Sequence, residues 1–259
     1  MISSTVPRMT FVTRQAFLAT DIAMLFRTIY SAVVAGVVAG VVLFALPRWT
    51  TLPLIHQAEL YEPTETAAHP PFHASDASED GLVRAAYTTG GDVLVAVGFG
   101  MLLTAMYALS GKYGLLAGIV WGLAGFATFH LGPAAVVPPT IPALDLAPLS
   151  LRQSAWLIAA ISTGLGLAIF AFGPRIAKAA GILLLFLPAV LFHYLFPLSG
   201  GEAPSQTLST LEHLFIVRAL ADGLVFWLVL GAISGWIFER SERLPSAFDP
   251  TWSEGRLRT

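Results

Sequence analysis

The sequence contains no cysteine, which excludes disulfide bonds and thiolate metal ligands. Charged residues are also scarce: they make up 12% of the 259 residues, against about 25% in an average soluble domain. The sequence has no G-x-x-x-x-G-K-[ST] loop for nucleotide hydrolysis and no basic, aromatic-interleaved patch for binding nucleic acid. Hydrophobic residues, by contrast, are abundant. They account for 56% of the chain, a composition typical of integral membrane proteins.

Six apolar stretches are long enough to cross a bilayer, whose hydrocarbon core of about 30 Å needs roughly 20 residues of helix. They are 26–46, 92–110, 113–130, 153–173, 178–196 and 218–238. Because lipid cannot hydrogen-bond to the backbone, the expected fold is all-α, a polytopic membrane helical bundle of about six transmembrane helices. Pro188 removes a backbone hydrogen bond within the fifth stretch, so we expect that span to be kinked or re-entrant there.

Lys and Arg residues divide unevenly between the two sides of this arrangement, with ten on the side of the N-terminus and four on the other. Cytoplasmic loops carry an excess of Lys and Arg, so we expect both termini to be cytoplasmic and 47–91 to be an outer loop. All six histidines and 11 of the 16 acidic residues then fall toward the outer side. The histidines are His56, His69, His73, His130, His193 and His213. A negative outer face concentrates cations, but the outer loops are also the longest and simply have more room for polar residues.

The stretch 53–62, at the start of the first outer loop, combines imidazole and carboxylate groups. In a short helix, His56, Glu59 and Glu62 are spaced by three and lie along one row of the surface. Nitrogen and oxygen donors together suit a first-row transition ion, whereas oxygen alone suits calcium or magnesium. A solvated amphipathic face is the competing interpretation. The next segment, 63–80, adds His69 and His73 in a composition typical of a mobile acidic tether.

Glycines repeat every four residues along the third span, at Gly114, Gly118 and Gly122, and form a smooth stripe for close helix packing. Small residues also line the first span, so we expect these two helices to pack together. His130 ends the third span, just before a Gly-Pro pair, where the last carbonyls lack helical partners. Ionisable groups at membrane depth are typical of a transport pathway, with an interfacial histidine that anchors the helix end as the alternative.

Two further polar features lie in the last two spans. His193 is near the outer end of the fifth span, where carbonyls freed by Pro188 are available to hold an ion beside it. A place in the aromatic belt is the alternative for this histidine. In the sixth span, Arg218 and Asp222 are four residues apart, and we expect them to form a local ion pair.

Several of these stretches resemble a known family. The run 54–62 after the first span, the run 121–133 at the end of the third, and the layout of the spans are similar to CbtA, a predicted cobalt transporter subunit. The resemblance covers 24–240 and implies a permease subunit linked to cobalt supply for cobalamin synthesis. It also implies a frequent partner, CbtB, which is a small single-span protein with a histidine-rich end. His56, Glu59 and Glu62 fall in the first family-like run and His130 in the second.

The chain departs from this family in two places. The family tends to place a histidine directly beside the proline of the fifth span, whereas here Ala189 follows Pro188 and the histidine is His193. Met24 matches the usual start of the family, so 1–23 are expected to be either an extension or the product of a misassigned start codon.

We therefore predict an integral protein of the bacterial or archaeal cytoplasmic membrane, with a single transmembrane domain at 24–240 and a cytoplasmic tail at 241–259. Its expected function is uptake of a divalent transition-metal ion, and the resemblance favours cobalt. The expected metal ligands are His56, Glu59, Glu62, His130 and His193. The ion is the transported substrate; we expect no organic cofactor, no catalytic residue and no enzyme activity. Besides lipid, the expected partners are a CbtB-like subunit and further copies of the chain.

Two alternatives belong to other classes. His130 and His193 are candidates for the paired axial ligands of a haem in an electron-carrying membrane protein. The chain is also a candidate for a purely structural subunit that supports a metal-binding single-span partner. An intramembrane metal-dependent hydrolase is disfavoured, because no helix carries two histidines at ligand spacing.

Overall fold

The computed structural model describes residues 11–61, 79–142, 144, 147–195 and 205–243, and these residues form helices and no strands. The helices are α1 (Phe11–Thr50), α2 (Leu52–Glu59), α3 (Glu79–Ser110), α4 (Leu115–Phe126), the π-helical η1 (Ala127–Leu131), α5 (Gly132–Ala134), α6 (Leu149–Phe172), the 3-10 segment η2 (Arg175–Ala177), α7 (Lys178–Leu195) and α8 (Gln206–Glu242). Six helical segments are long and apolar enough to cross a membrane. The predicted all-α membrane bundle is confirmed.

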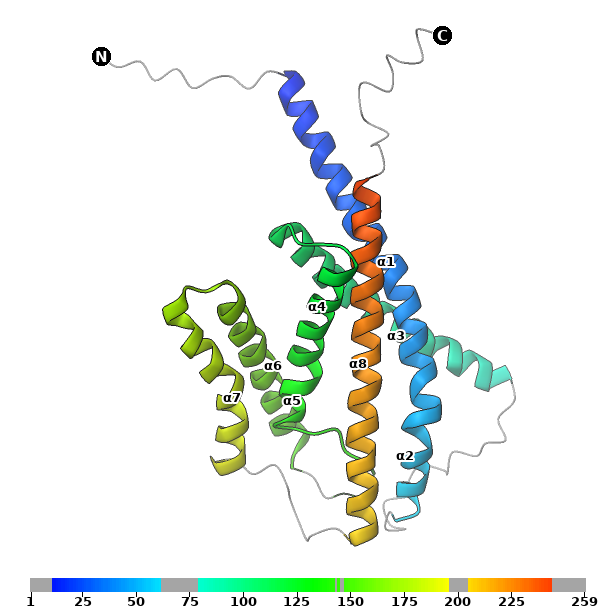
Figure 1. The fold of residues 1–259 in the computed structure, drawn as a ribbon. Coiled ribbons are helices and arrows are strands. Elements are labelled where there is room, and N and C mark those ends of the chain that lie inside the picture. The colour runs from blue at the N-terminus through cyan, green and yellow to red at the C-terminus, as the bar shows by residue number, and fades with distance from the viewer. Residues whose placement is uncertain (1–10, 62–78, 143, 145–146, 196–204, 244–259) are drawn as a thin grey trace.

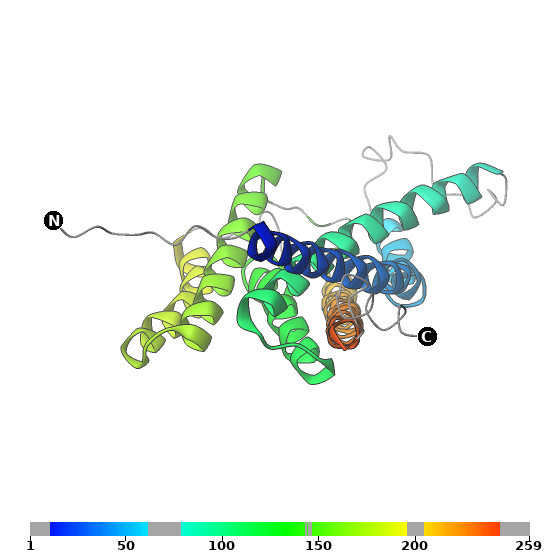
Figure 2. The same cartoon turned by 90° about the horizontal axis from the view of Figure 1, so that it is seen from above.

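The helices form two packing units (Figures 1 and 2). In the larger unit, α8 contacts each of α1, α3 and α4, and α1 also packs along α3. In the smaller unit, α6 and α7 form a hairpin that joins the rest through contacts of α6 with η1 and α5. Figure 1 shows that the start of α1 and the end of α8 lie at one end of the bundle, whereas α2, α5 and the start of α8 lie toward the other.

Small residues on α1 allow it to lie against α3 almost backbone to backbone. A Cβ added at Gly36 would be 2.6 Å from the Cα of Val97, and one at Gly40 would be 2.5 Å from the Cα of Val93. Contacts this short have no room for a side chain, so these two positions set the distance between the helices. The partner of the small stripe on the first span is therefore the second span.

The glycine stripe of α4 packs on α8, which carries small residues of its own. A Cβ at Gly118 would overlap the carbonyl oxygen of Gly231, and the backbone N–H of Gly114 donates to the carbonyl of Gly235 at 3.2 Å. The predicted pairing of the first and third spans is thus wrong. Both stripes mediate close packing as expected, but each lies on a different partner helix.

An aromatic core fills the space where α8 meets α1 and α3. Trp227 and Phe226 of α8 are each 1% exposed, and the Trp227 ring lies 4.9 Å from that of Phe99 on α3. The same core buries the hydroxyl of Tyr107, which hydrogen-bonds the Ser234 hydroxyl at 2.9 Å and so has a polar partner. This packing holds the middle of α8, and Trp227 in particular, in a fixed position.

Several helices extend beyond the predicted spans, and two differences bear on the predicted topology. The fifth span is expected from the sequence to be kinked or re-entrant at Pro188. It is one helix, α7, that continues through Pro188, so re-entry is not observed. The outer loop expected at 47–91 is largely helical where the structure describes it, because α1 ends only at Thr50 and α3 begins at Glu79.

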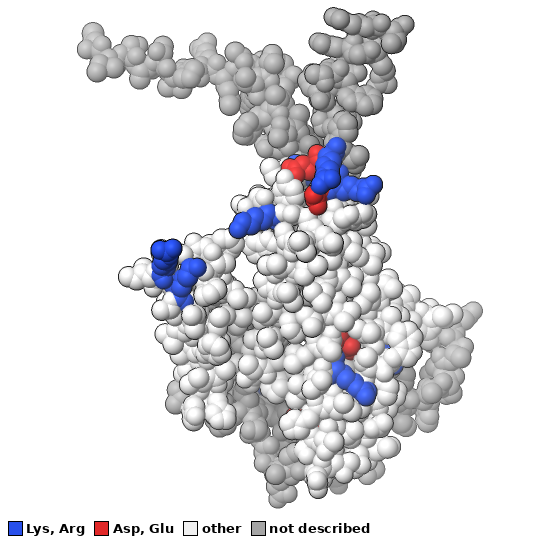
Figure 3. All heavy atoms as spheres, viewed as in Figure 1, with Lys and Arg blue, Asp and Glu red and all other residues white. Residues whose placement is uncertain are grey.

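Lys and Arg side chains of the described residues are more numerous at one end of the bundle than at the other. We call the end where α8 finishes the basic end; it carries Arg27, Lys112, Arg175, Lys178, Arg240 and Arg243. In Figure 3, most of the Lys and Arg surface lies at this end, which includes the turn between α6 and α7. We call the opposite end the histidine end, because the helical turns that lie toward it carry His56, His130, His193 and His213.

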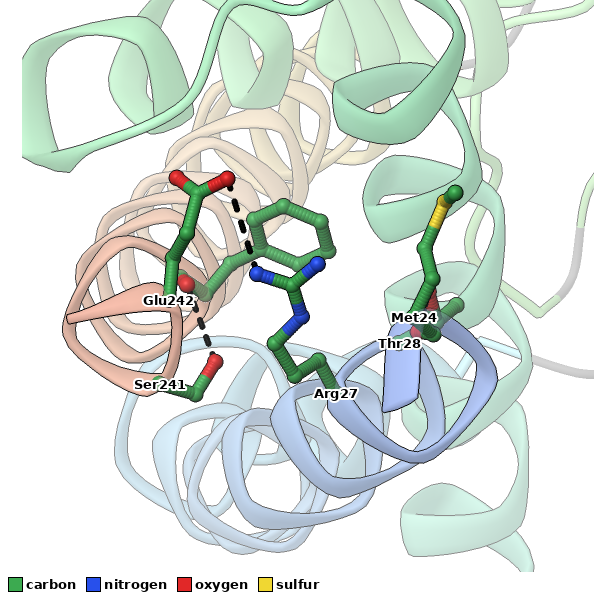
Figure 4. Close-up of polar contacts among 6 residues, drawn as sticks. Met24, Arg27, Thr28, Ser241 and Glu242 are labelled. Atoms are coloured by element: carbon green, nitrogen blue, oxygen red, sulfur yellow. Dashed lines mark hydrogen bonds and ion pairs between the residues drawn. The ribbon is translucent and has the colours of Figure 1, made fainter. Parts of the chain in front are cut away.

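An ion pair joins α1 to α8 at the basic end (Figure 4). The Arg27 guanidinium lies 3.5 Å from the Glu242 carboxylate and 5.9 Å from the centre of the Phe238 ring. The aromatic face adds a cation–π contact to the charge pair. The two longest helices of the chain are therefore tied together where both approach the basic end.

Candidate functional site

The short helix α2 carries two of the predicted metal ligands on its exposed face. Leu54 and Ala58 are buried and pack against Leu208 and Phe215 of α8, which fixes the opposite face of α2 on the bundle. His56 and Glu59 are exposed, one turn apart, as the amphipathic pattern predicts. Glu62, expected as a third ligand on this row, lies outside the described residues. The structure thus presents one imidazole and one carboxylate together on the surface of the histidine end.

His130 lies in the π-helical segment η1, between α4 and α5. The helix does not stop at His130 as predicted, because η1 and α5 continue it to Ala134 through Gly132 and Pro133. Gly132 permits this course: a Cβ there would overlap the hydroxyl of Thr163 on α6. Short π-helical insertions are frequent at functional sites, and this one turns His130 toward α8 while α6 packs behind it.

The imidazole of His130 is held by three neighbours. Its Nδ1 accepts a hydrogen bond from the indole N–H of Trp227 at 3.1 Å. The Phe126 ring stacks on it with centroids 5.9 Å apart, and a Cβ at Gly223 would overlap the imidazole. The absence of a side chain at Gly223 is therefore what lets the ring lie against α8. His130 is part of the packing between α4 and α8 as well as a candidate ligand.

Arg218 and Asp222 both turn to Thr50, the last residue of α1, instead of pairing with each other. The Thr50 hydroxyl donates to the Asp222 carboxylate at 2.5 Å, and the Arg218 guanidinium donates to the Thr50 carbonyl at 2.9 Å. The predicted local ion pair is thus replaced by a bridge between α8 and α1. Asp222 is 8% exposed and is the one charged residue among the buried side chains of the described region.

His193 and His213 have exposed side chains at the histidine end. His193 is in the last turn of α7, where its ring packs edge-on against Tyr194 with centroids 4.9 Å apart. This arrangement agrees with the aromatic-belt interpretation of His193. α7 packs against α6, whereas the His130 ring faces α8, so the packing gives no support to these two histidines as paired haem ligands.

The predicted metal ligands are not brought together as one centre in the part of the chain that the structure describes. His56 and Glu59 share α2, His130 lies on η1 and His193 on α7. Over that part, no group of three or more His, Asp or Glu side chains is close enough to hold a metal ion. Glu62, His69 and His73 lie outside it. The histidine end therefore presents separate donor groups on different helices.

Sequence reasoning did not single out Trp227, Gly223 or Thr50, which position His130 and Asp222. Trp227 lies 97 residues from His130 in the chain, so no local spacing connects them. Gly223 gave a usable signal, because Gly231 and Gly235 follow it at multiples of four and mark one small-residue face of α8.

Comparison with known proteins identifies a family that matches most of the chain. A model of the CbtA family, described as a probable cobalt transporter subunit, matches residues 26–239, which include all of α3 to α7 and nearly all of α8. No curated protein and no solved structure matches the chain. Since the family model covers well over half of the sequence, the chain belongs to the CbtA family of probable cobalt transporter subunits.

Proposed function

We propose that this chain is the membrane permease subunit through which a divalent transition-metal ion enters the cell, and that this ion is cobalt. The observation that carries the proposal is the sorting of donors in a member of the CbtA family. Four imidazole groups lie toward one end of the bundle, while six Lys and Arg side chains gather at the other, where they outnumber the carboxylates of Glu239 and Glu242. The excess of positive charge repels cations from the second end, whereas the imidazoles of the first end are donors that transition-metal ions bind.

The positive-inside rule supports an orientation with the basic end in the cytoplasm and the histidine end outside. In this orientation His56 and Glu59, together with Glu62, receive the ion on the outer surface. His130 is the next donor, because it lies within the membrane-spanning segment Leu115–Ala134. His193, on the exposed face of α7, is a further donor at the same end.

Cobalt is favoured by family membership, since imidazole and carboxylate donors also bind nickel and zinc. Supply of cobalt for cobalamin synthesis, in the cytoplasmic membrane of a bacterium or archaeon, is the proposed physiological setting. The sequence has no phosphate-binding loop, so the energy for transport comes from an ion gradient or from a partner. A CbtB-like single-span subunit is the proposed partner.

Cobalt uptake into cells that lack other cobalt importers tests this function directly. We expect His56→Ala, Glu59→Gln and His130→Ala each to lower the initial rate at limiting cobalt by about tenfold or more. Even the loss of a contact to a metal ligand costs about 10–100-fold in affinity or activity. His213→Ala is the matched control, because His213 is also exposed at the histidine end but is not among the proposed ligands.

Two results would count against the proposal. Undiminished uptake in both His56→Ala and His130→Ala cells, at equal protein levels, would show that neither histidine is a ligand needed for transport. Cobalt binding by a CbtB-like partner alone, with none by the purified chain, would favour the structural-subunit alternative. Isothermal titration calorimetry of each purified protein with cobalt shows which of the two binds the ion.

A further inference from the structure

The hydrogen bond between Trp227 and His130 determines which nitrogen of the imidazole carries the proton. The indole of Trp227 has an N–H donor and no acceptor, so the Nδ1 atom of His130, 3.1 Å away, is the acceptor. A neutral imidazole has one donor and one acceptor nitrogen. With Nδ1 as acceptor, the proton of neutral His130 is on Nε2.

Histidines that bind metals have the opposite arrangement. One nitrogen gives its lone pair to the metal, while the N–H of the other donates to a carboxylate, a carbonyl or water. In His130 the available lone pair is directed to the Trp227 indole, and Nε2 carries a proton that must leave before it can bind a metal. Neither nitrogen can bind a cation while this hydrogen bond is intact.

Packing fixes the donor side of this bond independently of His130. Trp227 is 1% exposed, stacks on Phe129 with centroids 5.7 Å apart and packs against Phe99 at 4.9 Å. A Cβ at Gly125 of α4 would overlap the indole, so the backbone of α4 also lies directly against it. The indole cannot turn away from His130 without rearranging the core of the larger unit.

We propose that Trp227 is a positioning residue that keeps His130 from binding the transported cation until their hydrogen bond breaks. This inference rests on the proposed function, in which His130 is the donor at membrane depth. Because Trp227 is on α8 and His130 on η1, separation of these two elements is the movement that makes the lone pair of His130 available to the ion.

Nuclear magnetic resonance on the full chain in lipid nanodiscs tests the hydrogen bond without any metal. With ¹⁵N-labelled histidine and tryptophan, we expect a through-bond N–N coupling between Trp227 Nε1 and His130 Nδ1, and a proton on His130 Nε2. His130→Ala assigns the signals by removing them. A proton on Nδ1 of His130, or the absence of this coupling from the wild-type chain, would overturn the proposal.

Cobalt titration of the same samples tests the consequence for binding. Trp227→Phe, which removes the donor, is expected to bind cobalt about two- to tenfold more tightly, the factor that corresponds to one ordinary hydrogen bond. Adding His130→Ala to this variant should abolish the gain. Trp236→Phe is the matched control, because Trp236 is an exposed tryptophan on the same helix. Benzothienylalanine at position 227, which keeps the fused rings and lacks the N–H, preserves the core if phenylalanine disturbs it.

The outcomes separate the two proposals. A gain at position 227 that depends on His130 supports the positioning role. Unchanged cobalt affinity in both position-227 variants, with the N–N coupling present in the wild type, overturns it and leaves the transport function standing. A wild-type chain and variants that all fail to bind cobalt would overturn the metal function itself, and this role of Trp227 with it.

Discussion

At the scale of single residues, Thr50 is the contact that ties the end of α1 to α8. Its hydroxyl lies 2.5 Å from the Asp222 carboxylate and 2.9 Å from the carbonyl of Leu46 in its own helix. Hydrogen bonds to a charged acceptor are roughly twice as strong as bonds between neutral groups, so the carboxylate is the preferred acceptor. The same residue accepts a hydrogen bond from Arg218 on its carbonyl, and both charged groups of this turn of α8 therefore depend on it.

Replacing Thr50 by valine should destabilise the protein by about 1.5–3 kcal/mol, because it leaves a buried carboxylate without its hydroxyl donor. Thr50→Ser should retain most of the stability. Thr210→Val is the matched control: the Thr210 hydroxyl also donates to the carbonyl four residues before it, but Thr210 is exposed and bonds no carboxylate among the described residues. Denaturant unfolding in detergent measures the three variants. Equal stability of Thr50→Val and Thr210→Val would show that the Asp222 contact contributes nothing.

At the scale of helices, small residues determine which elements pack together. The contacts of Gly118 with Gly231 and of Gly36 with Val97 bring backbones so close that any side chain would push the helices apart. Without a hydrophobic driving force between helices in lipid, this close van der Waals contact is a main source of their association.

Gly118→Ala should therefore destabilise the α4–α8 pair by about 1–3 kcal/mol, the usual cost of inserting a methyl group into a well-packed contact. Gly98→Ala provides the matched control, because Gly98 is exposed within α3 and a Cβ there meets nothing within 4 Å. That change should be neutral or stabilising by up to about 1 kcal/mol, since alanine favours the helix more than glycine does. Thermal unfolding in detergent compares the two. A neutral result for Gly118→Ala would contradict the packing shown by the structure.

Sequence reasoning predicted the elements well and their partners poorly. Six spans follow from length and composition, because each apolar stretch must satisfy its own backbone in lipid. The partner of the Gly118 stripe does not follow from the sequence. Both α1 and α8 carry small residues, and only the complete packing determines which of them lies against α4. At the site, His130 was identified as an ionisable group at membrane depth. Its contact with Trp227 depends on helix packing across 97 residues and on the π-helical turn of η1, which no local pattern predicted.

At the scale of the whole molecule, the absence of cysteine allows the orientation to be tested with single introduced thiols. Gln57 is exposed on α2 at the histidine end, and Lys112 is exposed between α3 and α4 at the basic end. A membrane-impermeant maleimide should label Gln57→Cys in intact cells and label Lys112→Cys only after the membrane is permeabilised. The wild-type chain is the unlabelled control. The reverse pattern would place the histidine end in the cytoplasm and contradict uptake from outside.

The length of α8 makes it the link between the two ends of the bundle. Its 37 residues extend about 55 Å, whereas the hydrocarbon core is about 30 Å thick, so the two ends of this helix reach beyond the hydrocarbon core. The segment that carries α2 against Leu208 and Phe215 is continuous with the segment that holds Glu242 beside Arg27. The surface that carries His56 and Glu59 and the ion pair that closes the basic end are therefore joined by one uninterrupted helix.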